Sequence, residues 1–101
     1  MKLSDIPQFI LDREDGSKII AELEAHSCNP AEDIAKACSK IFVVWIEGRE
    51  DRSRLLGASN MIELNEIYDD IDHNEEELEW IYDLEAKRYR TWRNNGLSLI
   101  N

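Results

Sequence analysis

The charge of this chain is concentrated in one segment, which any fold of the chain must accommodate. Residues 55–86 contain eleven Asp or Glu residues and no Lys or Arg, so this acidic segment alone carries a charge of −11. The whole chain of 101 residues has a net charge of −10, which leaves about +1 for the rest. Arg54 directly precedes the acidic segment, and a run of bases begins at Lys87. A concentrated acidic surface attracts basic surfaces and repels phosphate and membrane headgroups.

Size and composition indicate one folded domain that spans residues 1–101. A chain of this length is typical of a single domain, and its 43% hydrophobic content exceeds that of a disordered acidic tail. The longest apolar run, Ile41–Ile46, is far shorter than the roughly 20 residues that cross a bilayer. Acidic residues interrupt the N-terminal stretch, so it lacks the pattern of a signal peptide. We therefore expect a cytoplasmic protein without a membrane partner, in which Cys28 and Cys38 are reduced thiols.

Helix signals predominate in the N-terminal half. Ser4 and Ser17 are suited to cap two short helices. Asn29-Pro30 is a further start signal, and apolar residues follow it at helical spacing: Ile34, Cys38, Ile41, Phe42 and Trp45. This pattern predicts a third helix that ends at Gly48. The run Ile41–Ile46 is short and rich in β-branched residues, which makes a buried strand the alternative, but the cap and the spacing favour a helix.

Two further helices are predicted after a loop at residues 49–58. Ser59 or Asn60 is suited to cap the first of them. Its apolar positions again follow helical spacing: Met61, Leu64, Ile67, Tyr68 and Ile71.

The last helix is predicted from Glu75 to about Asn94, after a turn at residues 72–74 and before a stop at Gly96. A turn this short joins antiparallel helices, so residues 59–95 should form an acidic helical hairpin. The predicted fold class is therefore all-α: a small single-domain bundle of four or five helices that ends in this hairpin.

Helix polarity explains only part of the acidic segment. Acids near the start of the last helix and bases near its end suit the macrodipole. From Glu63 to Asp72, however, the acids continue to the C-terminal end of the preceding helix, where they oppose the dipole. This face is either plainly solvated or meets a basic partner. The last helix also has a broad apolar stripe, from which we expect Trp80 to be exposed to a partner. The residues predicted to bind a partner are Glu63, Glu66, Asp69, Asp70, Asp72, Glu76, Glu79, Trp80 and Asp83.

Metal sites have weak support in the sequence. Residues 70–74 begin like a calcium loop, but Glu75 stands where the loop needs Gly, and Ile81 stands where it needs Glu. Asp70 and His73 are spaced like one carboxylate–histidine pair without a second copy. The spacing of the cysteines and His26 is not that of a zinc site. We therefore predict no metal and no cofactor.

Catalytic motifs are equally absent from the sequence, which contains no Gly-rich phosphate loop and no nucleophile elbow. We therefore predict that the protein is not an enzyme.

The basic residues that follow the acidic segment have a pattern found in nucleic-acid-binding proteins. Lys87, Arg88, Arg90 and Arg93 alternate with Tyr89 and Trp92, a pattern that suits stacking on bases and contact with phosphate. A net charge of −10 opposes binding to nucleic acid. We therefore expect no direct nucleic-acid partner and interpret the two aromatic residues as part of the core.

Two functional hypotheses remain. The first is a small acidic, non-enzymatic inhibitor or modulator whose carboxylates take the place of phosphates on a basic surface of another protein, such as a nucleic-acid-binding surface. Phage- or mobile-element-encoded inhibitors and immunity proteins act in this way. The second is a structural or assembly module, such as a homo-oligomeric adaptor or a small chaperone, in which Trp45, Trp80 and Trp92 form the contact surface. A homodimer is compatible with both.

Overall fold

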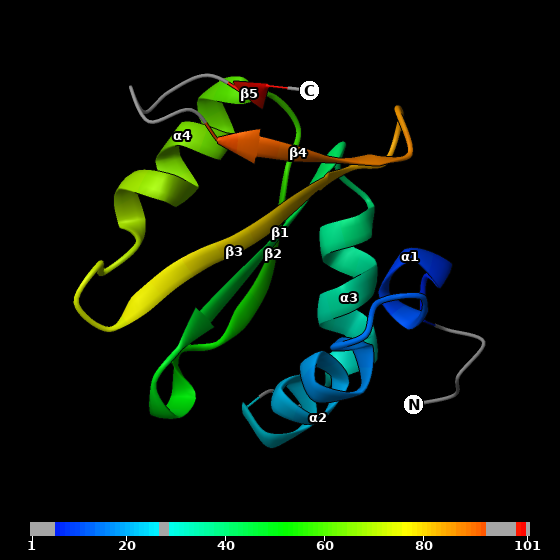
Figure 1. Cartoon of the computed structure of the whole chain (residues 1–101), viewed down its shortest axis with the longest axis vertical. Coiled ribbons are helices and arrows are strands. Elements are labelled where there is room, and N and C mark those ends of the chain that lie inside the picture. Colours follow the sequence, from blue (N-terminus) through cyan, green and yellow to red (C-terminus); the bar gives the residue numbers. More distant parts are fainter. Residues whose placement is uncertain (1–5, 27–28, 93–98, 101) are drawn as a thin grey trace.

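The computed structural model describes residues 6–26, 29–92 and 99–100 and shows an α+β fold (Figure 1). Its elements in chain order are α1 (Gln8–Leu11), α2 (Gly16–His26), α3 (Pro30–Cys38), β1 (Phe42–Gly48), a 3-10 helix η2 (Glu50–Arg52), β2 (Arg54–Ala58), α4 (Met61–Asp70), β3 (Glu76–Asp83), β4 (Arg88–Trp92) and β5 (Leu99–Ile100). The prediction of an all-α bundle is therefore wrong. The predicted cap Ser4, the Cys28 thiol and the predicted stop Gly96 lie outside the described residues.

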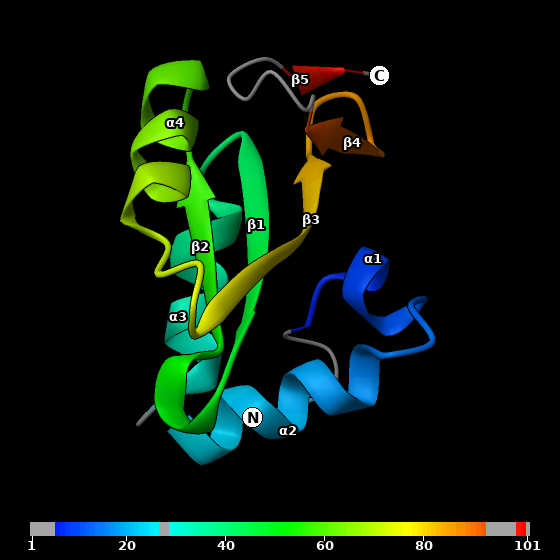
Figure 2. The same ribbon diagram turned by 60° about the vertical axis from the view of Figure 1, so that its left-hand side comes forward.

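The strands form an antiparallel sheet in the order β2-β1-β3-β4-β5. β1 and β2 form a hairpin, and α4 then carries the chain across to β3 on the other side of β1. Two apolar clusters show that α4 packs on one face of the sheet, whereas α1, α2 and α3 pack on the opposite face (Figure 2). Helices therefore cover both faces of the sheet, and β2 forms one of its edges.

Apart from Ile41, which directly precedes the strand, the run Ile41–Ile46 belongs to β1, so the helix predicted there is wrong and the alternative, a buried strand, is confirmed. Val43 and Trp45 face α1–α3, and Val44 and Ile46 face α4. All four side chains are 0% exposed. A strand that is buried on both faces has a continuous apolar run instead of an alternating one, and β-branched side chains favour the extended backbone.

Two of the predicted helix starts are confirmed. The Asn29 side chain accepts a hydrogen bond from the Glu32 N–H at 3.2 Å at the start of α3, and Asn60 accepts one from the Glu63 N–H at 2.9 Å at the start of α4. α3 ends at Cys38, well before Gly48, so the cap was predicted correctly and the length was not.

The predicted last helix is instead the β3–β4 hairpin, and a β-bulge explains the error. Trp45 of β1 pairs with Trp80, and Ile46 pairs with Leu78, which leaves Glu79 as an extra residue in β3. The bulge places Leu78 and Ile81 in the same cluster under α4. A spacing of three residues on one face is also what a helix produces, so the bulged strand gave the sequence an apparent helical period.

Asp83 closes the turn of this hairpin. Its Oδ1 accepts hydrogen bonds from the N–H groups of Glu85 and Ala86, each at 3.0 Å, and its Oδ2 accepts one from Arg90 Nη2 at 2.8 Å. Burial raises the pKa of Asp83, but the hydrogen bonds from Ala86 and Arg90 outweigh it, so the pKa lies below the ordinary value of 3.8. The ionised carboxylate therefore stabilises the folded state.

Asp83→Asn should lower the free energy of unfolding at pH 7 by about 1–3 kcal/mol, because the half-buried Arg90 loses its charged acceptor. Glu85→Gln, an exposed change in the same turn, should alter it by less than about 0.5 kcal/mol. Since the folded-state pKa of Asp83 is lowered, its contribution is complete above pH 3.8 and is lost as the pH falls further. Urea denaturation at several pH values would measure this, and a difference between Asp83→Asn and wild type that does not shrink as the pH falls below 3.8 would contradict it.

Candidate partner-binding surface

The nine residues predicted to bind a partner lie on three neighbouring stretches of the structure. Glu63, Glu66, Asp69 and Asp70 lie on α4, Asp72 lies in the turn that follows, and Glu76, Glu79, Trp80 and Asp83 lie on β3. The helical hairpin that was expected to present them does not form, because its second arm is a pair of strands.

Trp80 lies in the core, so the expectation that it is exposed is wrong. Its side chain is only 6% exposed. The ring makes edge-to-face contacts with Phe9, at a centroid distance of 6.1 Å, and with Tyr89, at 5.6 Å. The Arg13 guanidinium lies 4.9 Å from the ring centroid. The bulge in β3 turns this side chain toward α1 and away from solvent.

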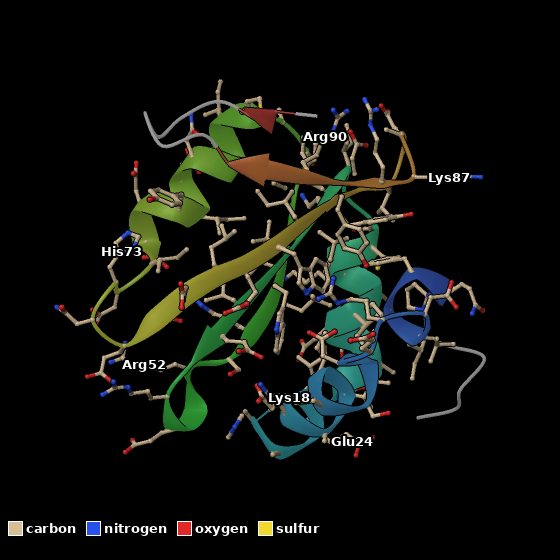
Figure 3. The ribbon with its side chains drawn as sticks, in the orientation of Figure 1. Lys18, Glu24, Arg52, His73, Lys87 and Arg90 are labelled. Carbon is tan, nitrogen blue, oxygen red and sulfur yellow. The ribbon has the colours of Figure 1, made fainter. Side chains whose placement is uncertain are left out.

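Two arginines of the β1–β2 hairpin neutralise acids at the end of α4 and the start of β3. Arg54 donates from Nε and Nη2 to the two carboxylate oxygens of Glu76, at 3.0 and 3.2 Å, and its Nη1 lies 3.4 Å from Asp70. Arg52, labelled in Figure 3, donates to Asp72 at 3.2 Å. These ion pairs explain how the acids are tolerated against the dipole of α4. The sequence interpretation missed both arginines because it assigned them to a loop.

Glu63 has a structural role at the start of α4. Its carboxylate accepts a hydrogen bond from the Ser59 N–H at 2.7 Å, while its own N–H donates to Asn60. This reciprocal arrangement satisfies amide groups that have no partner within the helix. Like Asp83, Glu63 therefore contributes to the fold whether or not a partner binds.

Other predicted residues border an open groove between α4 and the outer side of β2. This acidic groove has a volume of about 560 Å³, and its lining residues are Lys40, Leu56, Gly57, Glu63, Glu66, Ile67 and Asp70. Three carboxylates on its α4 side face one lysine. Glu66 and Asp69, which lies outside the lining, are exposed on α4, and no ion pair engages either of them within the described residues.

A second concave region lies where β1 ends and β3 begins. This acidic hollow has a volume of about 520 Å³, and its lining residues are Glu47, Gly48, Arg49, His73, Asn74, Glu75, Glu76, Glu77 and Glu79. Lys18 of α2 (Figure 3) donates to Glu47 at 2.7 Å, which raises the pKa of the lysine. Partial burial, with repulsion from Glu47 and Glu77, raises the pKa of Glu79. Glu79 therefore holds its proton more tightly than an isolated glutamate does.

The described residues contain no group of three or more His, Cys, Asp or Glu that could hold a metal ion. Asp70 and Asp72, which begin the calcium-like sequence, are paired with arginines, and the His73 ring packs against Tyr68 with 5.2 Å between centroids. Cys38 is a half-buried free thiol, and burial raises its pKa. A raised pKa disfavours the nucleophilic thiolate at neutral pH.

The basic residues after the acidic segment are used in two ways. Arg90 pairs with Asp83, whereas Lys87 extends from the hairpin turn into solvent (Figure 3). Tyr89 packs edge-to-face on Tyr82 at 4.8 Å, and its hydroxyl donates to the Phe9 carbonyl at 3.2 Å. Tyr89 therefore joins α1 to the hairpin, although its side chain is still partly exposed. The side chain of Trp92 lies outside the described part of the structure.

No family model, curated protein or solved structure matches this chain. In the part of the chain that the structure describes, no helix is long and apolar enough to cross a bilayer.

Arg54→Met should lower the free energy of unfolding by about 2 kcal/mol, because it leaves the Glu76 carboxylate, 6% exposed, without its counterion. Arg52→Met is the matched control: its partner Asp72 is 42% exposed, so the loss should stay below about 1 kcal/mol. Adding Glu76→Gln to Arg54→Met should restore part of the stability, since a neutral amide is easier to bury. Equal losses for the two arginine variants in urea denaturation would contradict this assignment.

Proposed function

We propose that the protein is a non-enzymatic inhibitor or modulator that uses the acidic groove and the exposed face of α4 to occupy a basic surface of another protein. The observation that carries the proposal is the division among the acids of α4 and the turn after it. Asp70 and Asp72 have arginine partners, whereas Glu66 and Asp69 are exposed without an ion pair among the described residues. Unpaired carboxylates on a rigid helix can attract and orient a basic partner.

The same charge argues against direct binding to nucleic acid, because the chain carries a net charge of −10. A partner whose basic surface normally holds phosphates would be blocked by carboxylates that occupy the same positions. We place this action in the cytoplasm, since the free thiol of Cys38 suits a reducing compartment. The alternative, an assembly module with exposed tryptophans, has less support because Trp45 and Trp80 are buried.

Poly-lysine serves as a probe of this surface. The double variant Glu66→Lys/Asp69→Lys should bind it at least about tenfold more weakly than wild type, because like charges then face each other. Glu14→Lys/Glu24→Lys changes the net charge equally at exposed sites outside the groove and should have a clearly smaller effect (Glu24 is labelled in Figure 3).

Affinity should also fall steeply as the salt concentration rises from about 0.05 to 0.5 M, since salt screens exposed charges. Fluorescence anisotropy would measure both effects. Equal losses for the two double variants, or an affinity that does not depend on salt, would refute the proposal.

A further inference from the structure

The outer side of β2 exposes backbone groups in a regular pattern. Leu84 N–H donates to the Ile41 carbonyl at 2.9 Å, and Arg49 N–H donates to the Glu75 carbonyl at 3.0 Å. On the other side, Ile41 N–H donates to the Ala58 carbonyl at 3.1 Å, so the Ala58 carbonyl faces β1. Because peptide groups alternate along a strand, the even-numbered residues within β1 direct theirs to β2 and the odd-numbered residues direct theirs to β3. In the β1–β2 register, the residues opposite the odd positions are Leu55 and Gly57. Their N–H and C=O groups consequently point away from β1, toward the open edge of the sheet.

Two hollows flank this edge, one on each face of the sheet. The acidic groove lies on the α4 side, and a smaller hollow of about 210 Å³ lies on the α3 side, with a lining of Asp33, Lys36, Ala37, Lys40, Leu55, Leu56 and Gly57. The two share Lys40, Leu56 and Gly57, so they adjoin at the β2 edge. At Gly57 an added Cβ would lie 2.5 Å from the Ala37 carbonyl oxygen, so only glycine lets α3 approach this closely.

We propose that the outer edge of β2 takes up an extended segment of another protein as an additional strand, with Lys or Arg at every second position. The peptide groups of Leu55 and Gly57 would bind the backbone of that segment. Because side chains alternate across a strand, one set would enter the acidic groove beside Glu66 and Asp70. The other set would enter the hollow that Lys36 and Lys40 line, which favours uncharged residues there. The inference rests on the proposed function and specifies the form of the basic partner.

Charge argues against a second copy of the chain as the occupant. Antiparallel pairing of β2 with β2 of another copy, about a two-fold axis, keeps α4 of both copies on the same side of the joined sheet. The exposed acids of one α4, such as Glu66, would then approach those of the other, and Lys40 would approach Lys40. Like charges across an interface are unfavourable, and lysine at an edge strand is a known device against edge-to-edge pairing.

The test uses a peptide of about eight residues in which Lys alternates with Thr, longer than the five-residue β2. In an added strand the N–H groups of all Lys residues face one way and those of all Thr residues face the other way. N-methylation of one set therefore removes the hydrogen bonds to β2, whereas methylation of the other set leaves them intact. Both peptides keep the same charge. We expect one methylated peptide to lose at least about tenfold in affinity relative to the other.

The outcomes separate the inference from the proposed function. Equal affinities of the two methylated peptides, or no binding of the unmethylated peptide at low salt, would overturn strand addition. Affinity for the unmethylated peptide should fall at least about tenfold in Glu66→Lys and stay near wild type in Glu24→Lys. Equal values in both variants would overturn the proposed charge-based function instead. A dimer in light scattering that the peptide does not dissociate would assign the edge to a second copy and overturn the proposal.

Discussion

The burial of β1 on both of its faces is the constraint on which the rest of the structure depends. Val43 and Trp45 need cover from α1–α3, while Val44 and Ile46 need cover from α4. An apolar strand of this kind is stable only at the centre of a sheet with helices on both sides. β2 and β3 therefore flank β1, and α4 crosses over it to join them (Figures 1 and 2). The outer side of β2 remains as an edge, with α3 and α4 on either side of it.

The same arrangement determines which carboxylates of the acidic segment have arginine partners. Because β2 lies under the end of α4, Arg54 reaches Asp70 and Glu76, and the largest concentration of acid near the helix C-terminus is balanced within the chain. Neutralisation stops there: Glu66 and Asp69, on the exposed side of α4, gain no such partner among the described residues. The net charge is thus a poor guide to the binding surface, and the position of the arginines is a better one. Of these two acids, Glu66 lines the groove beside the open edge, so charge and backbone hydrogen bonding can act on the same partner.

The caps of α3 and α4 and the apolar period of α4 were interpreted correctly, whereas the apolar spacing in β1 and β3 was wrongly interpreted as helical. The caps at Asn29 and Asn60 depend only on neighbouring residues, so they could be found from the sequence. β1 and the bulged β3 have apolar residues at spacings that a helix shares, and only tertiary packing distinguishes the two cases. The β2 edge could not be predicted without the strand order. The role of Arg54 could not be predicted either, because its partners Asp70 and Glu76 are distant from it in the sequence.

Native-state amide exchange at Leu56 and Gly57 tests the account most directly, because these neighbours in β2 direct their peptide groups to opposite sides of the strand. Leu56 faces β1 in the derived register, so its amide should exchange slowly, on the scale of global unfolding. The Gly57 amide faces the open edge and should exchange at least about a hundredfold faster in the free protein. Addition of the alternating lysine peptide should slow Gly57 toward the rate of Leu56. A Gly57 amide that is as protected as Leu56 in the free protein, or one that the bound peptide leaves unchanged, would contradict the account.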